Sequence, residues 1–393
     1  MKRLLCVLLA CILLLGLLPL TAAADDALFT DPRVNFNSTR PRESCLLRDP
    51  CVVVYQGTYF IYGTGAAWPG YGCYVSRDME NFAGPVRVWT PPAGHESDTD
   101  YWAPECHYYN GNFYIFATYH SRVTGHRGVS IFRADNPLGP FEEITAQQTL
   151  PETGEVTRQI SPLGWDAIDG TLYVDPQGQP WLVFVHEWTS MPDGIGDFSA
   201  AKLSSDLSTL LTEPVSLFRA NTLAGRPFNG VTDGCWLYRS KTGELLMLWS
   251  GSGGTYCIGV ARSESGDILG PWVQNPRLLY AQNSSFPLEG GHGSLFYDLD
   301  GQLSVSLHAP NASNAATGVV EHTVYFAVED LGDTLRIVGA PDDYHGSDIF
   351  ANPVSAAWLE AGLHATTAFQ RFWYEVIYYI LWLPSRLWML FGF

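Results

Sequence analysis

Short apolar runs separated by turns fill the chain between residues 48 and 338, and helical periodicity is almost absent. Runs of this length that end at turn residues are typical of β-strands. They fall into five groups, at 48–65 with 72–82, 101–120 with 128–144, 165–188 with 198–210, 231–253 with 257–272, and 290–311 with 322–338. This recurrence predicts one β unit repeated over most of the chain.

The five groups share one internal order. A polar or acidic residue precedes an apolar run, a Gly-bearing hairpin turn follows, and a second apolar run comes after the turn. The hairpins lie at 56–57, 110–111, 177–178, 242–243 and 300–301. A β-sandwich would not place an equivalent hairpin after each first strand, whereas radial repeats of antiparallel strands do. We therefore predict an all-β, five-bladed β-propeller over residues 25–345.

Charge and aromatic content indicate which classes of molecule the protein can bind. The net charge is −18, from 40 acidic and 22 basic residues, so no basic face is expected to follow a phosphate backbone. This excludes nucleic acid as the expected partner. The 13 Trp and 20 Tyr residues suit an oligo- or polysaccharide, because the apolar faces of sugar rings stack on aromatic side chains. The oligomeric state is left open.

The first 24 residues have the pattern of a secretory signal peptide. Two basic residues are followed by a long apolar run and by three small residues at 22–24, so we expect cleavage near Ala24 and export. Removal of this segment leaves Cys45, Cys51, Cys73, Cys106, Cys235 and Cys257 in an oxidising compartment. Their spacing is not a zinc pattern, and a bridge from Cys51 to Cys73 is among the pairings that the sequence leaves open.

The other end carries an apolar, aromatic tail at 372–393, after a linker or terminal segment at 346–371. Glu375, Pro384 and Arg386 interrupt the tail, so its uninterrupted run is too short to span about 30 Å of hydrocarbon as one helix. Trp and Tyr favour membrane interfaces. We expect this tail to associate with a membrane surface rather than to pack on the propeller.

Acidic residues recur at one position of the predicted propeller. The first strand of each blade lines the central channel, so the residues that lead the five first runs meet at the channel mouth. They are Asp49, the segment 102–105, Asp169, Asp233 and His292. Each Asp alone reads as a turn former before Pro or Gly, but the hairpins already have their own turn residues. Carboxylates held close shift one another's pKa, which separates an acid from a base as glycosidic cleavage requires.

Four motifs in this order give the sequence a resemblance to glycoside hydrolase family 43. They are RDPCVVVYQGTYFIYGTG (48–65), YWAPECHYYNGNFYIF (101–116), AIDGTLYVDPQGQPWLVF (167–184) and GGHGSLF (290–296). The resemblance runs from about Arg48 to Val338. It implies a five-bladed propeller that hydrolyses terminal or internal pentose linkages with inversion. Within that range we expect an exo-acting α-L-arabinofuranosidase or β-xylosidase that acts on plant-type polysaccharide.

The resemblance also implies a role for each leading residue. Asp49 matches the general base that activates water, and Asp169 matches the carboxylate that tunes and orients the acid. Asp233 falls at the general-acid position. His292 matches a histidine near the channel axis that, in some members, borders calcium or its hydration shell. No other cofactor is implied.

Four residues are expected to contact the sugar at the channel mouth, namely Trp102, Glu105, Glu187 and His292. For Glu187, which follows a second strand, a rim salt bridge is an equally good interpretation.

The sequence departs from the family at the acid. Most members have Glu-Gly-Pro where this chain has Asp233-Gly234-Cys235. Asp is one methylene shorter, which leaves its carboxyl about 1.5 Å short unless the backbone or substrate moves. A subgroup with Asp at this position is the interpretation we favour. The alternatives are that Glu187 or Glu105 serves as the acid, or that the propeller binds sugar without catalysis.

Other enzymes of related fold provide further alternatives. Sucrose- and fructan-cleaving propellers share the Arg-Asp-Pro and Glu-Cys pairs but use an Asp nucleophile in Trp-x-Asn-Asp-Pro, and this chain lacks that motif. A galactofuranosidase of the same fold stays open, because ring choice depends on loop contacts.

Overall fold

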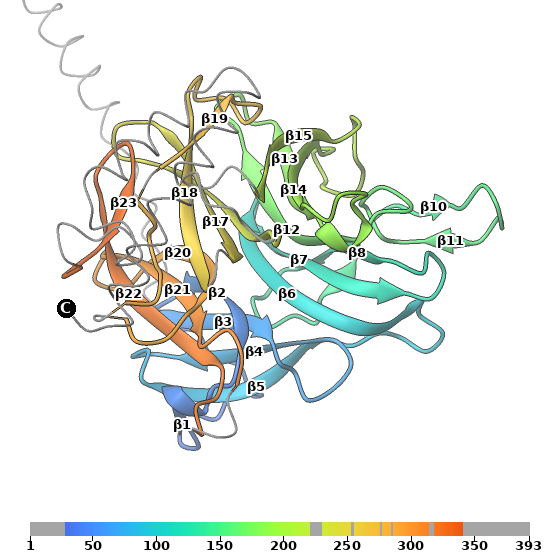
Figure 1. Ribbon diagram of the computed structural model, residues 1–393. Coiled ribbons are helices and arrows are strands. Elements are labelled where there is room, and N and C mark those ends of the chain that lie inside the picture. The colour runs from blue at the N-terminus through green and yellow to red at the C-terminus, as the bar shows by residue number, and fades with distance from the viewer. Residues whose placement is uncertain are drawn as a thin grey trace, which may run out of the picture.

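A computed structural model describes residues 28–340, apart from 221–229, 253–254, 276, 284–285 and 314–317. In this part of the chain, five antiparallel sheets stand side by side around a common centre, so the predicted five-bladed β-propeller is confirmed (Figure 1). The predicted signal peptide, the segment 346–371 and the tail 372–393 lie outside the described residues. Among the described residues, no helix has the length and apolar character needed to cross a membrane.

Each blade is built from four strands that are consecutive in sequence and pair in order from the centre outward. Blade 1 has β2 (Arg48–Tyr55), β3 (Thr58–Thr64), β4 (Tyr71–Ser76) and β5 (Asn81–Trp89), with β1 (Arg40–Pro41) added at its edge. Blade 2 has β6 (Ser97–Tyr109), β7 (Asn112–Ser121), β8 (Arg127–Ala134) and β9 (Glu142–Glu143). Blade 3 has β12 (Ala167–Val174), β13 (Pro180–His186), β14 (Asp197–Lys202) and β15 (Val215–Arg219).

Blade 4 has β16 (Asp233–Arg239), β17 (Leu245–Ser252), β18 (Tyr256–Ser263) and β19 (Trp272–Gln274). Blade 5 has β20 (Gly291–Tyr297), β21 (Leu303–Ala309), β22 (His322–Asp330) and β23 (Leu335–Ile337). A hairpin of β10 (Gln148–Thr149) and β11 (Val156–Thr157) projects from the side of the ring (Figure 1). The sequence patterns did not predict it.

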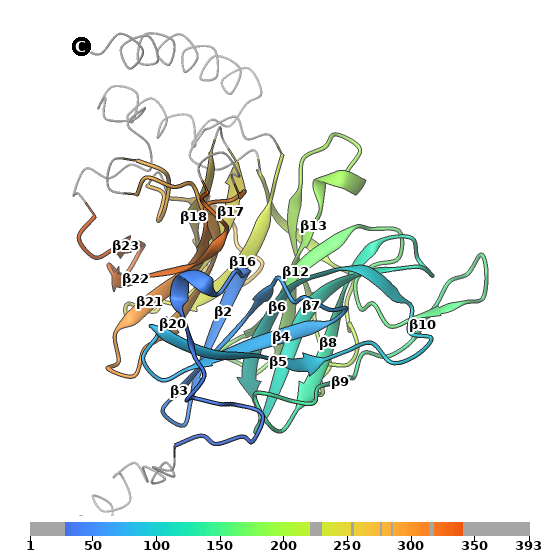
Figure 2. The same ribbon diagram turned by 90° about the horizontal axis from the view of Figure 1, so that it is seen from below.

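The innermost strands form a closed ring. Strands β2, β6, β12, β16 and β20 each contact the next, and β20 returns to β2. They lie near the middle of the molecule in Figure 2. The chain therefore brings the starts of five distant segments to one place, as the repeat pattern predicted.

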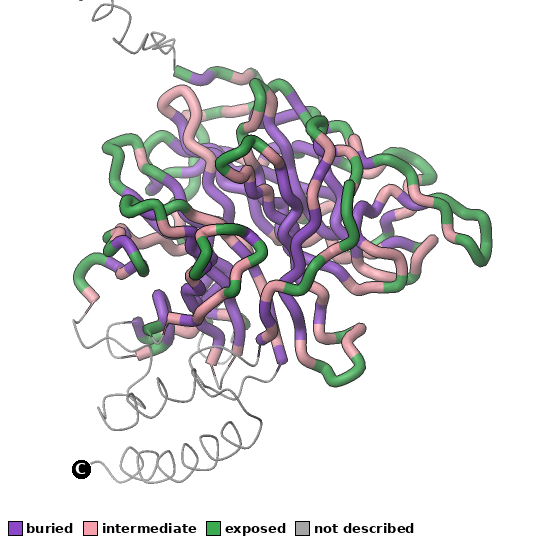
Figure 3. The backbone as a smooth tube through the Cα atoms, turned by 90° about the horizontal axis from the view of Figure 1, so that it is seen from above, coloured by how far each residue is buried: buried purple, intermediate pink, exposed green. Residues whose placement is uncertain are grey.

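The second strands explain the stability of this ring. Strands β7, β13, β17 and β21 are almost entirely buried, since both their faces pack against neighbouring sheets. Five apolar clusters result, and each joins two adjacent blades. Figure 3 shows the buried backbone in the middle of the molecule and the exposed loops around it. Burial on both faces also explains why these strands read as continuous apolar runs.

Blades 1 and 5 share no strand within the described part of the chain, so side chains close the ring. Arg42, in the short 3₁₀ helix η1 (Arg42–Ser44), donates to the Tyr325 hydroxyl at 2.7 Å and lies over its ring at 4.9 Å. Arg48 forms an ion pair with Glu321 at 2.6 Å. These contacts supplement the apolar cluster between the two blades.

The structure does not contain the Cys51–Cys73 disulfide, which was among the pairings that the sequence left open. All six cysteines of the described residues are buried free thiols. Cys51 pairs in register with Tyr62, and Tyr62 pairs with Cys73, so a whole strand lies between the two thiols. Two strand spacings amount to about 10 Å, beyond the reach of a disulfide.

Candidate active site

Each inner strand carries a β-bulge just before its regularly paired stretch, and one residue in each of these bulges has a positive φ. These residues are Asp49 (φ 52°), Ala103 (φ 41°), Asp169 (φ 54°), Gly234 (φ 45°) and His292 (φ 54°). Left-handed backbone is uncommon for residues other than Gly, and residues in such conformations cluster at functional sites. Three of these side chains, from β2, β12 and β20, converge at the channel mouth.

The register corrects one prediction, which placed Asp233 at the same blade position as Asp49 and Asp169. The equivalent residue is Gly234, and Asp233 stands one position earlier, opposite Ser250. Gly is required at 234 because a Cβ there would lie 2.7 Å from the His292 ring. Asp233 therefore enters the site from a different backbone position than the other two carboxylates.

Asp49 is held ionised. Its Oδ1 lies 3.2 Å from His292 Nδ1, and its Oδ2 accepts a hydrogen bond from the Thr64 hydroxyl at 2.6 Å. Burial alone would raise its pKa, but the nearby His292 and Arg48 outweigh burial and hold the pKa of Asp49 well below its usual range. The Asp49 side chain keeps 12% of its surface exposed.

His292 and Asp169 form the middle of the site. His292 Nδ1 lies 3.7 Å from Asp169 Oδ2. Burial lowers the pKa of His292, yet the charges of Asp49 and Asp169 outweigh it and raise the pKa to about 10, so the ring is an imidazolium. Burial raises the pKa of Asp169 to about 6, the attraction of His292 offsets part of this, and the Asp49 charge adds to it. Asp169 is only 7% exposed.

The backbone N–H groups at the bulges share one hydrogen-bonding pattern. At four of the five bulges, the N–H donates to a polar side chain on the second strand of the preceding blade. The donor and acceptor pairs are Asp49 with His308, Ala103 with Thr64, Asp169 with Thr118, and His292 with Ser250. These acceptors are polar residues in otherwise apolar runs, and that recurrence is the signal that could have identified them.

Blade 3 departs from this hydrogen-bonding pattern, and the departure orients Asp169. The equivalent second-strand residue is Val185, which has no acceptor. The Gly234 N–H donates instead to Asp169 Oδ2 at 2.8 Å. Asp169 is thereby fixed between a backbone donor and the His292 ring, directly beside the residue that precedes Gly234.

Asp233 has the properties of a proton donor. The Tyr256 hydroxyl donates to its Oδ2 at 2.9 Å. Burial and then the nearby charge of Asp169 raise the pKa of Asp233 to about 7, although His292 and Tyr256 act in the opposite direction. The site thus holds one strongly ionised carboxylate and one carboxyl that is protonated below neutral pH, and such a pair can divide acid and base roles. Tyr256 and His308 were not predicted from sequence.

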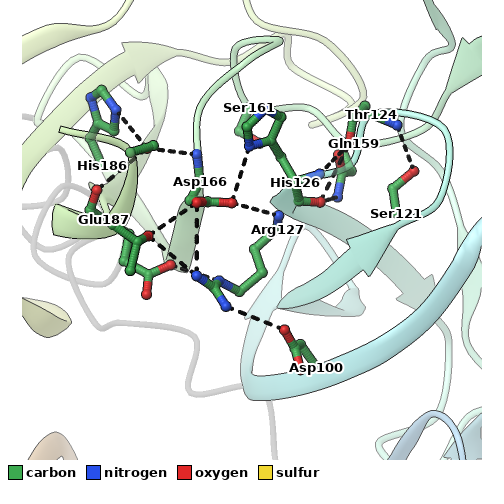
Figure 4. Close-up of polar contacts among 12 residues, drawn as sticks. Asp100, Ser121, Thr124, His126, Arg127, Gln159, Ser161, Asp166, His186 and Glu187 are labelled. Carbon is green, nitrogen blue, oxygen red and sulfur yellow. Dashed lines mark hydrogen bonds and ion pairs between the residues drawn. The ribbon is translucent and has the colours of Figure 1, made fainter. Parts of the chain in front are cut away.

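Glu187 forms the rim salt bridge that was the alternative interpretation. It follows β13, is 4% exposed, and accepts from Arg127 Nε at 2.7 Å. Figure 4 shows Arg127 reaching Asp100, Asp166 and Glu187. Burial raises the pKa of Glu187 to about 7, and Arg127 offsets part of that effect. The Asp233 side chain is more accessible to solvent than that of Glu187.

The two other predicted sugar contacts are also engaged with protein groups. Trp102 is partly exposed, but the Arg127 guanidinium lies over its ring at 5.1 Å. Glu105 is buried, and its Oε1 lies 2.6 Å from His107 Nε2. His107 in turn stacks on Trp236. One face of Trp102 is therefore occupied, and Glu105 lies among channel-lining groups with its own partner.

Calcium next to His292 stays a prediction. No group of three or more His, Cys, Asp or Glu side chains within the described residues could hold a metal ion. His292 Nδ1 is directed at Asp49. The residues around this ring do not fit a site in which they coordinate a metal ion directly.

Comparison with known proteins agrees with this geometry. Residues 39–328 match the profile of Glycosyl hydrolases family 43. The chain is 25% identical over 278 residues to Extracellular endo-alpha-(1->5)-L-arabinanase 1 of Bacillus subtilis, a match that covers 65% of this chain and 76% of the relative. It is 24% identical over 297 residues to Extracellular exo-alpha-(1->5)-L-arabinofuranosidase ArbA of Cellvibrio japonicus, covering 68% and 80%.

A solved structure gives a further match. The endo-arabinase from Bacteroides thetaiotaomicron superposes with a TM-score of 0.62 at 34% identity, over 74% of this chain and 97% of that one. The profile match spans most of the chain and includes every converging residue of the channel mouth. The chain belongs to glycosyl hydrolase family 43.

Proposed function

We propose that the protein hydrolyses α-1,5-linked L-arabinofuranosyl bonds of arabinan or its oligosaccharides with inversion at the anomeric carbon. One observation carries the proposal: Asp49, strongly ionised, and Asp233, with a pKa raised to about 7, converge on the His292 imidazolium in a family 43 propeller. The names of the relatives above support arabinan as substrate. Solved structures named for xylan substrates match at 24% identity or less and support the fold alone.

In the proposed reaction, Asp49 takes a proton from a water molecule as the water oxygen bonds to the anomeric carbon. The bond from that carbon to the leaving oxygen breaks, and Asp233 gives its proton to the leaving oxygen. Asp49 ends protonated and Asp233 ends ionised, so exchange of one proton with solvent restores the site. The imidazolium of His292 balances the carboxylate charges throughout.

Asp169 acts through Asp233 in this scheme. Its negative charge is among the causes that raise the pKa of Asp233, and the Gly234 N–H fixes its position. It is buried, so we assign it to positioning and tuning rather than to direct attack.

We also propose that the enzyme acts outside the cell. The signal-like residues 1–24 and the extracellular names of two relatives support export. Association of the tail 372–393 with a membrane surface stays a prediction, and it would place the enzyme at a surface rather than free in the medium.

The test is a substrate panel with the purified chain lacking residues 1–24. Debranched arabinan, α-1,5-arabino-oligosaccharides, xylo-oligosaccharides and aryl glycosides of both sugars are incubated, and the first product anomer is identified by proton NMR. We expect arabinose or short arabino-oligosaccharides with inverted configuration, and no release by Asp49→Ala. Retained configuration would exclude the mechanism. Binding to arabinan with no release from any substrate would favour a non-catalytic propeller.

A further inference from the structure

Tyr256 is the one buried hydroxyl group that contacts Asp233 among the described residues. It lies at the start of β18, on the third strand of blade 4, and is 2% exposed. Its hydroxyl donates to Asp233 Oδ2 at 2.9 Å, which is an ordinary hydrogen-bond length. The family resemblance did not predict a role for this residue.

Three neighbours keep the Tyr256 ring in place. A Cβ at Gly291 would lie 2.2 Å from its Cε1, so only Gly leaves room for the ring. His308 stacks on the ring with centroids 5.6 Å apart and planes at 25°. The Tyr256 N–H donates to Glu289 Oε2 at 2.9 Å, which fixes its backbone. The hydroxyl is therefore a rigid donor rather than a mobile one.

We propose that Tyr256 is a positioning residue that holds Asp233 Oδ2, so that Oδ1 carries the proton to the leaving oxygen. This inference rests on the proposed function, because it takes Asp233 as the acid. A carboxylic acid donates from one oxygen only and accepts at the other. A fixed donor on Oδ2 assigns these two tasks and limits rotation of the short Asp side chain.

The charges around Asp233 make this role measurable. Asp169 on β12 and Asp49 on β2 favour its protonated form, whereas His292 on β20 and Tyr256 on β18 favour the ionised form. Removing the hydroxyl removes a donor that stabilises the carboxylate, so Asp233 should stay protonated to higher pH. A residue that only fills space would leave this titration unchanged.

The experiment compares the wild type with Tyr256→Phe and with Tyr280→Phe as the matched control. Tyr280 is also a buried tyrosine, and its hydroxyl donates to the Leu288 carbonyl at 2.8 Å, away from the carboxylates. For Tyr256→Phe we expect kcat on arabino-oligosaccharide to fall about tenfold at unchanged KM, as for loss of one hydrogen bond to a charged group. The activated aryl arabinofuranoside should lose less than about twofold.

The alkaline limb of the kcat profile should move to higher pH in Tyr256→Phe and stay in place in Tyr280→Phe. Equal losses on both substrates, or an unmoved limb, would overturn the proposal. Carbon-13 NMR of labelled Asp carboxyls, assigned with Asp233→Asn, measures the Asp233 titration directly. If the wild type cleaves no substrate, the proposed function fails, and this titration still decides whether Tyr256 governs Asp233: an unshifted titration overturns its role.

Discussion

Replacing Asp233 with Asn removes the proposed proton donor while preserving its size. Asn cannot supply the proton, although its amide oxygen can still accept from the Tyr256 hydroxyl. We expect hydrolysis of arabino-oligosaccharide to fall by about 10² to 10⁴, the usual contribution of a general acid. A 4-nitrophenyl arabinofuranoside should be largely spared, because its leaving group departs without protonation.

The structure sets the pH at which this loss is greatest. With a pKa raised to about 7, Asp233 is mostly protonated at pH 6, whereas a carboxyl at the ordinary value of 3.8 would be almost wholly ionised. Activity needs the protonated form, so the wild-type rate should fall as pH rises through about 7. The Asn variant should lack this alkaline limb.

The assay measures kcat and KM on both substrates between pH 5 and 8, with Asp300→Asn as a control for the same chemical change at an exposed turn. Equal oligosaccharide activity in the wild type and Asp233→Asn would refute the assignment. In that case, Glu187→Gln tests whether Glu187 is the acid instead. Because Glu187 is buried against Arg127, we expect that variant to affect both substrates alike, and a loss confined to oligosaccharide would move the acid role to Glu187.

Three other predictions follow from the same geometry. Asp49→Asn should lower kcat on oligosaccharide and aryl substrate alike by about 10² or more, since both need an activated water; retention of either activity would remove Asp49 from the base role. Gly234→Ala should lower the free energy of unfolding in urea by about 1–3 kcal/mol, with Gly243→Ala, which has a positive φ but open space, losing clearly less. Because the pKa of His292 rises from 6.5 to about 10 on folding, its contribution to stability is complete below about pH 6.5 and is lost as pH rises to about 10. Urea unfolding should show this decline in the wild type, and an equally steep decline in His292→Gln would contradict the assignment.

The repeat pattern sufficed to predict the propeller because both of its signals are local. Each second strand packs on both faces and so reads as an apolar run, and each hairpin carries its own Gly. The convergence of Asp49, Asp169 and His292 followed from topology alone, since equivalent positions of a ring meet at its centre. Their roles, in contrast, came from a family resemblance and stay predictions until they are measured.

The sequence could not predict the strand register at the bulges or the contacts that the site residues make with other side chains. A bulge shifts pairing by one residue without any compositional mark, so Asp233 and Gly234 could not be told apart as the bulge residue. Tyr256 and His308 come from strands whose runs otherwise read as core. A salt bridge was one interpretation of Glu187, but its partner could not be identified from the sequence, because Arg127 is 60 residues away.

The dipeptide Asp233-Gly234 shows why two residues typical of a turn can be functional. Gly234 takes the positive φ, leaves room for the His292 ring, and donates its N–H to Asp169. Any side chain at 234 would disturb all three, and with them the charges that raise the pKa of Asp233. The placement of the acid therefore depends on its neighbour as much as on its own length. A Glu at 233 would carry the carboxyl about 1.5 Å farther from the backbone, up to or beyond the fixed hydroxyl oxygen of Tyr256. We therefore expect the function of Asp at 233 to depend on Tyr at 256. Asp233→Glu alone should lose activity, and replacing Tyr256 by Phe as well should restore it.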